Sequence, residues 1–127
     1  MSYNMPKRQI DYNNTIMYKL VCNDINIKDL YVGHTTNWAK RKTNHKGCSN
    51  NLFGRDSNTT LYNTIRSYGG WENWSMIMIE KYPCDNKLEA RKRERQLMEI
   101  ENSNLNSLSS YLSIDERRSN SLDKYYK

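Results

Sequence analysis

The stretch Asp29-Leu30-Tyr31-Val32-Gly33 ends an alternating segment with a tyrosine and a glycine, and a short basic helix is expected after it. In that helix Trp38, Arg41 and His45 stand at positions i, i+3 and i+7, so their side chains point the same way. A guanidinium group is a planar, permanently charged donor that matches phosphate oxygens. A tyrosine, an arginine and a histidine that meet beside one helix therefore indicate a phosphate site.

The segment before this stretch predicts a partner strand. Residues 15–22 alternate in the way that a strand does, and Asn23-Asp24 has the composition of a turn. Residues 27–33 would then be the return strand of a β-hairpin. Two helices are expected next: one capped by Thr36 or Asn37, and a second over residues 60–68.

Three further expectations complete the secondary structure. Gly47 would end the first helix, and residues 50–58 would form a polar loop. Residues 74–82 are the most apolar run and too short for a good helix, which predicts a central strand buried on both faces. Asp85 or Asn86 would open the longest helix, which would end at Glu99 or Asn102.

The order β-β-α-α-β-α predicts an α/β (α+β) fold, a small sandwich in which helices flank a central, three-stranded, largely antiparallel sheet. At 127 residues the chain has room for one domain with its own core. We expect a loose arm over residues 1–13, the folded domain over residues 14–106, and a polar tail or weak helix over residues 107–127.

Composition favours a polyanionic partner and a reducing compartment. Lysine and arginine number 20 against 14 acidic residues, for a formal charge of +6. Residues 1–9 lack the apolar stretch of a signal peptide, and no segment reaches the apolar length that spans a membrane. Three scattered cysteines argue against a disulfide framework. We therefore expect a soluble intracellular protein that acts in the cytoplasm or at sites of DNA replication.

Glu94 is the strongest chemical signal that the residues give by themselves. Ala90, Glu94 and Leu97 share one face of a helix that is rich in positive charge. An inward carboxylate is costly unless it is paired or binds a metal. Its position leaves three explanations open: a salt bridge to a basic residue on another element, an i, i+4 partner on the same helix, and a Mg²⁺ site.

The other candidates each have a plain structural explanation when they are taken alone. Tyr18 and Tyr31 could be half-buried strand residues, and Arg41 and His45 could belong to a solvated helix face. A zinc site could also be drawn from His34, His45, Cys48 and Cys84, but the spacing matches no usual zinc pattern. The ordered set favours a phosphate-handling site.

That ordered set resembles the GIY-YIG nuclease superfamily. Met17-Tyr18-Lys19 and Tyr31-Val32-Gly33 look like the two halves of its motif, with Ile16 and Met17 in place of the glycine and isoleucine. Residues 69–84 are similar to small stand-alone members of large DNA viruses, whose site of action would be the host cell. The hairpin between the motif halves is somewhat longer than usual.

The resemblance extends along residues 14–106. Arg41 and His45 fall where the family has its arginine and, in many members, a histidine one turn later. Glu94 matches the metal-binding glutamate, and Asn106 resembles the asparagine that braces the site, by fixing Glu94 or the backbone near it. His34 stands where a small hydroxyl residue is commoner; it would contact phosphate or lie on the surface, and we favour the surface.

The resemblance implies a divalent-metal-dependent endonuclease that hydrolyses phosphodiester bonds in nucleic acid, with DNA preferred and RNA not excluded. Glu94 would hold Mg²⁺ or Mn²⁺, and Arg41 would clamp the phosphate. Tyr31 would take a proton from the attacking water, helped by His45, while Tyr18 would orient the water or phosphate. Nucleic-acid contacts would come from Lys40, Arg41, Lys42, Lys46 and His34.

Two other classes stay open. The chain could be a nucleic-acid-binding module that keeps the fold without the activity. It could also be a nuclease subunit whose target choice comes from a protein partner, and a homodimer would serve the same purpose. No sequence feature indicates a membrane partner.

Overall fold

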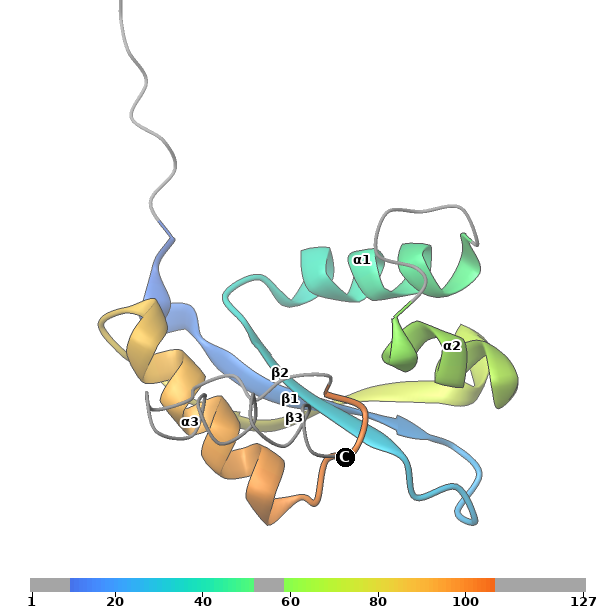
Figure 1. Cartoon of the computed structure of the whole chain (residues 1–127). Helices are drawn as coiled ribbons and strands as arrows, with labels where there is room; N and C mark the ends of the chain where they lie inside the picture. The colour runs from blue at the N-terminus through green and yellow to red at the C-terminus, as the bar shows by residue number, and fades with distance from the viewer. Residues whose placement is uncertain (1–9, 52–58, 107–127) are drawn as a thin grey trace, which may run out of the picture.

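The computed structural model describes residues 10–51 and 59–106. Within them, three strands and three α-helices follow the predicted order β-β-α-α-β-α, which confirms the α+β class (Figure 1). The elements are β1 (Ile16–Cys22), β2 (Leu30–Thr35), α1 (Trp38–Asn50), α2 (Thr60–Ser67), β3 (Trp74–Lys81) and α3 (Lys87–Ile100).

The sheet is antiparallel throughout, with the strand order β2-β1-β3. The predicted hairpin is therefore confirmed, but the central strand is β1, and the prediction of a central strand at residues 74–82 is wrong. β3 lies at an edge, and Ile77 and Met78 are 42% and 50% exposed. An apolar run without a period of two does not distinguish an edge strand from a central one.

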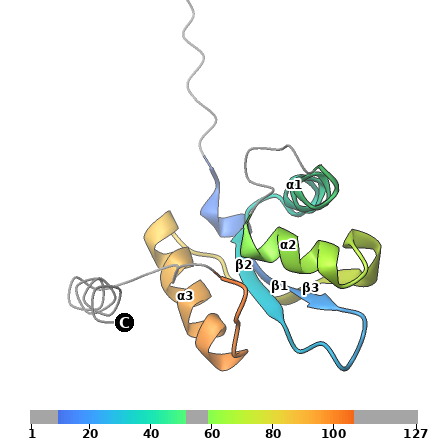
Figure 2. The same ribbon diagram turned by 45° about the vertical axis from the view of Figure 1, so that its right-hand side comes forward.

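Helices cover both faces of the sheet, as expected for a sandwich (Figure 2). Alternate residues of β1 point to opposite faces, so Tyr18 and Leu20 join one apolar cluster and Met17 joins another. The first cluster includes Leu61 and Ile65 of α2, and the second includes residues of α3. The hairpin therefore contributes to two cores.

Side-chain caps begin the helices. The Asn37 side chain accepts a hydrogen bond from the Lys40 amide at the start of α1, and Asn86 does the same at the start of α3. The expected stop at Gly47 is wrong, because α1 continues to Asn50 and the Gly47 carbonyl accepts from the Asn51 amide. A single glycine lowers helix stability by only about 1 kcal/mol, which the rest of the helix can offset.

Several expectations fall partly or wholly outside the described residues. These are residues 1–9 of the arm, residues 52–58 of the polar loop and residues 107–127 of the tail. Within the described part of the arm, Tyr12–Asn14 form a short 3₁₀ helix capped by Asp11. No helix in the described ranges is long and apolar enough to cross a membrane.

The segment after α3 returns along the outer edge of β2. The amides of Asn104 and Leu105 donate to the Leu30 carbonyl, and the Asn104 side chain accepts from the Leu30 amide at 2.9 Å. Asn106 makes a matching pair with Val32: its Oδ1 accepts from the Val32 amide at 3.0 Å, and its Nδ2 donates to the Val32 carbonyl at 2.8 Å. Two asparagines thus satisfy a strand edge that would otherwise lie open.

Gly33 lies opposite Tyr18 in the hairpin register, and the Tyr18 ring crosses directly over it. A Cβ at position 33 would stand 2.6 Å from the Tyr18 hydroxyl oxygen and 2.9 Å from a ring carbon of Tyr31. Tyr18 is fully buried, so its ring has no free space into which it could shift. The glycine is therefore a requirement of this packing.

Gly33→Ala should destabilise the protein by about 1–3 kcal/mol, because it overpacks the contact with Tyr18. Gly47→Ala is the matched control: a Cβ there meets nothing within 4 Å, and alanine should stabilise α1 by about 0.5–1 kcal/mol. Urea unfolding measures the free energy of unfolding of both variants, which should decrease for Gly33→Ala and increase for Gly47→Ala. Equal stability of Gly33→Ala and the wild type would contradict the packing argument.

Candidate functional site

Two tyrosines from neighbouring strands form the base of the candidate site. Tyr18 of β1 lies opposite Gly33, and Tyr31 of β2 lies opposite Leu20, so both rings project from the same face of the sheet. Their centroids are 6.3 Å apart. Trp38 of α1 closes the other side, with its ring edge-on to Tyr18 at 5.9 Å. Tyr18 is fully buried, whereas Tyr31 remains partly exposed.

His45 of α1 is held between two hydroxyl groups. Its Nε2 lies 2.7 Å from the Tyr18 hydroxyl, and its Nδ1 lies 2.8 Å from the hydroxyl of Tyr62 on α2. Trp71 stacks on the imidazole at 6.3 Å, and only 2% of His45 is exposed. Both ring nitrogens therefore have partners inside the core.

Burial sets the protonation of this cluster. It raises the pKa of Tyr18, Tyr31 and Tyr62, and it lowers the pKa of His45 to about 4. The charge of Arg41 acts on all four: it lowers the pKa of each tyrosine, against the effect of burial, and adds to the lowering at His45. At neutral pH the imidazole is therefore uncharged.

Arg41 lies on the exposed face of α1, where it also lines a hollow of about 500 Å³ with Tyr62 and Cys48. Although the guanidinium is open to solvent, its field reaches the buried tyrosines, so an anion bound to it would lie beside them. The other cations of this helix are exposed and belong to the surface around the site: Lys40, Lys42 and Lys46.

Glu94 of α3 points inward, as the sequence predicts, on the same face as Ala90 and Leu97. Only 10% of its side chain is exposed, and its charge raises the pKa of Tyr31 after the larger effect of burial. Glu94 therefore lies close to Tyr18 and Tyr31, although it belongs to α3 and the two tyrosines belong to the sheet.

His34 of β2 contacts Glu94, with its Nδ1 3.3 Å from the Glu94 Oε1. The His34 side chain is 17% exposed, so our preference for a surface position is wrong. Strand alternation explains this, because His34 lies opposite Met17 and shares the face of β2 that packs against α3. The contact does not have hydrogen-bond geometry, and Nδ1 has no other partner among the described residues.

Asn106 occupies a position behind the site. Its side chain was expected to fix Glu94 or the backbone near it, but it binds the main chain of Val32 and accepts a hydrogen bond from Ser103. Val32 stands between Tyr31 and Gly33, so Asn106 holds the strand that carries the second tyrosine.

Sequence reasoning missed Tyr62. Leu61 and Ile65, its neighbours on α2, are both buried, so Tyr62 belongs to an apolar helix face. A tyrosine on such a face needs a hydrogen-bond partner for its hydroxyl, and that requirement was the available signal. The partner itself, His45, comes from a different helix and could not be identified from spacing.

The donors at Glu94 fit a divalent cation. A carboxylate is a general ligand for Mg²⁺ and Mn²⁺, which also accept waters and substrate phosphates. In residues 10–51 and 59–106, no group of three or more His, Cys, Asp or Glu side chains is arranged to hold a metal, so the zinc alternative at His34, His45, Cys48 and Cys84 has no such cluster. Coordination by one protein carboxylate, completed by substrate and water, suits this arrangement.

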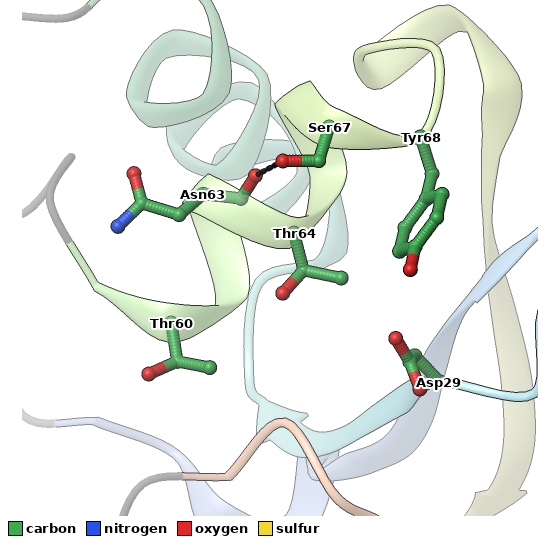
Figure 3. A pocket seen from close by; sticks show the side chains of 6 residues that line it. All are labelled: Asp29, Thr60, Asn63, Thr64, Ser67 and Tyr68. Atoms are coloured by element: carbon green, nitrogen blue, oxygen red, sulfur yellow. Dashed lines mark hydrogen bonds between the residues drawn. The ribbon is translucent and has the colours of Figure 1, made fainter.

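A second hollow, of about 340 Å³, lies between α2 and the start of β2 (Figure 3). The Tyr68 hydroxyl points toward the Asp29 carboxylate across it, and Thr60 and Thr64 line the wall (Figure 3). Its only charged lining side chain is acidic, which disfavours phosphate. It contains none of the predicted site residues.

Comparison with known proteins identifies the domain. Residues 14–107 match the family model of the GIY-YIG catalytic domain. Comparisons with curated proteins and with solved structures gave no significant match. The family match includes both tyrosines, Arg41, His45 and Glu94 and covers most of the chain. The chain therefore belongs to the GIY-YIG catalytic domain family, and its domain is of the nuclease type.

Proposed function

We propose that this chain is a divalent-metal-dependent endonuclease that hydrolyses phosphodiester bonds, with DNA as its substrate. The observation that carries the proposal is the convergence of Tyr18, Tyr31, His45 and Glu94, from four different elements, within the field of Arg41. A domain that only binds nucleic acid has no need of a buried carboxylate beside one buried and one partly exposed tyrosine. The set therefore supports an active enzyme.

Arg41 and Glu94 would handle the phosphate. The guanidinium can bind two phosphate oxygens and stabilise the negative charge that develops on them in the transition state. A divalent cation at Glu94 would supply a Lewis acid for the scissile phosphate and its leaving oxygen. Because Glu94 is nine-tenths buried and on the rigid helix α3, its carboxylate is held in place before substrate arrives.

Tyr31 is the better placed of the two tyrosines to meet a water molecule, because Tyr18 is fully buried. As a general base it needs a lower phenol pKa than burial and the Glu94 charge allow. Arg41 and the neighbouring Tyr18 hydroxyl both lower the pKa of Tyr31. Neutralising the charge of Glu94 would remove a further obstacle.

His45 would act on Tyr31 through Tyr18. A neutral imidazole donates from one nitrogen and accepts at the other. If Tyr62 donates to Nδ1, then Nε2–H donates to the Tyr18 oxygen, and the Tyr18 hydroxyl hydrogen is free to point at Tyr31. In this arrangement the hydroxyl hydrogens of Tyr62 and Tyr18 and the Nε2 hydrogen of His45 all point along the row toward Tyr31, which stabilises negative charge on the Tyr31 oxygen. We therefore assign the Nε2-protonated tautomer of His45 to the active site.

The surface around the site suits a polyanion. A hollow of about 720 Å³ beside α1 is lined by two lysines and one acidic residue, together with three tryptophans: Lys42, Lys46, Glu72, Trp38, Trp71 and Trp74. Phosphate contacts of this kind are largely independent of sequence. The resemblance of residues 69–84 to small viral members adds support for DNA as the substrate and for action on replicating DNA in a host cell.

Incubation with supercoiled plasmid tests the proposal. The wild type should nick or linearise the plasmid with Mg²⁺ or Mn²⁺ and be inactive in EDTA. Glu94→Ala should reduce cleavage to background while folding and DNA affinity remain, because it removes a metal ligand from a basic surface. If Glu94 served only as a salt-bridge partner, the variant would be active and less stable by roughly 3–5 kcal/mol. That outcome would overturn the assignment.

Tyr31→Phe keeps the ring and removes only the hydroxyl. If Tyr31 is the general base, the cleavage rate should fall by roughly 10²–10⁴-fold at unchanged DNA affinity and stability. Tyr18→Phe should affect stability more, by about 1–3 kcal/mol, because it leaves the buried His45 Nε2 without a partner. The exposed Tyr68→Phe is the control and should behave as the wild type. A larger rate loss in Tyr18→Phe than in Tyr31→Phe would reverse the two roles.

Protonation of His45 should destabilise the fold at acidic pH. Histidine titrates near pH 6.5 in the unfolded chain and near 4 in the folded protein, so the unfolded state binds more protons between these values. Stability should therefore be greatest above about pH 6.5 and fall by roughly 3 kcal/mol as the pH drops through the folded pKa. Urea unfolding across this range measures it. His45→Phe should remove this part of the pH dependence; an unchanged slope would contradict the assignment.

A further inference from the structure

The Glu94–His34 contact is poor as an ion pair. Charge-assisted hydrogen bonds between an imidazolium and a carboxylate are usually about 2.7–2.9 Å long and well aligned. Here Nδ1 and Oε1 are 3.3 Å apart, and Nδ1 makes no hydrogen bond although it is buried. A buried nitrogen without a partner in a folded protein calls for an explanation.

The same separation suits two ligands of one cation. Donor atoms that lie about 2.0–2.2 Å from an ion and subtend about 90–109° at it are about 2.8–3.6 Å apart. The 3.3 Å between Nδ1 and Oε1 falls within this range. The two side chains come from β2 and α3, which pack against each other, so the pair is held by rigid elements.

His34 is also the available imidazole. The chain has two histidines, and both nitrogens of His45 are bonded to tyrosine hydroxyls. A metal ligand needs a free lone pair, which His34 Nδ1 can supply when the ring is neutral. The carboxylate oxygen that His34 Nδ1 contacts is that of Glu94, the residue that would hold the cation.

We propose that His34, through Nδ1, is a second protein ligand of the divalent cation at Glu94, and that it gives the site a preference for Mn²⁺ and Co²⁺ over Mg²⁺. Oxygen ligands and water suit Mg²⁺, whereas an imidazole nitrogen favours transition metals, with affinity rising from Mn²⁺ to Co²⁺. The inference rests on the proposed function only in using Glu94 as the first ligand.

Histidine ¹⁵N NMR of the wild type tests ligation without relying on activity. Addition of Zn²⁺, a diamagnetic ion with the same ligand preference, should shift the Nδ1 resonance of His34 and leave both nitrogens of His45 unchanged. His34→Phe identifies the resonances. A saturating titration of the wild type that leaves His34 Nδ1 unshifted would overturn the proposal.

Calorimetric titrations with Mg²⁺, Mn²⁺ and Co²⁺ alone measure the preference. Glu94→Gln should abolish binding of all three. His34→Phe should weaken Mn²⁺ and Co²⁺ at least tenfold, as loss of even an indirect metal partner does, and change Mg²⁺ much less. Asp85→Asn removes an exposed carboxylate just before α3 and should match the wild type.

The outcomes separate the two levels of inference. If the wild type binds no divalent cation, the metal site of the proposed function fails, and this inference fails with it. If binding is lost in Glu94→Gln but the Co²⁺-to-Mg²⁺ affinity ratio is the same in His34→Phe and the wild type, only the role of His34 is wrong.

Discussion

The hydrogen bond between the Tyr18 hydroxyl and His45 Nε2 joins the central strand to α1 inside the core. Both partners are buried, so removing one leaves the other with an unsatisfied polar group. Gly33 must lack a side chain for Tyr18 to reach this position. The bond also places the start of α1, and with it Arg41, beside the hairpin. Core packing and the chemistry of the site thus depend on the same two side chains.

The candidate site therefore has two parts. Tyr18, His45 and Tyr62 form a hydrogen-bonded row in the apolar core, where burial keeps the imidazole neutral. Tyr31 belongs to the edge strand β2 and is partly exposed, and Glu94 of α3 lies close enough to raise its pKa. In the proposed enzyme, the buried hydrogen-bonded row would hold the polar side chains in a fixed orientation, and the partly exposed Tyr31 would make the contact with substrate.

Local pattern was sufficient for the order of the elements, the hairpin and the inward direction of Glu94, and it located the helix caps to one of two neighbouring residues, Thr36 or Asn37 and Asp85 or Asn86. These depend on residues that are close in sequence, whose spacing or capping chemistry is set by one helix or one turn. The edge position of β3 depends on which strand pairs with which, and its apolar run carries no period that records this.

Other features were decided by contacts between distant segments. Gly47 remains helical because its helix continues past it. Tyr62 finds its partner on another helix, and Asn106 finds its partner on β2. His34 is the exception, because its alternation with Tyr31 and Gly33 already placed it on the opposite face of the strand. What the sequence could not predict is that α3 packs against that face and covers His34.

The amide of Asn106 occupies both main-chain hydrogen-bonding groups of Val32, the residue between Tyr31 and Gly33. The backbone around Tyr31 is consequently held from both sides: Tyr31 pairs with Leu20 of β1, and the next residue, Val32, is bonded to the Asn106 side chain. Such a strand has little freedom to adapt to what it binds. In the proposed nuclease, the geometric adjustment between enzyme and substrate would then fall on the nucleic acid, whose backbone would have to bend or open to bring a phosphate to Tyr31.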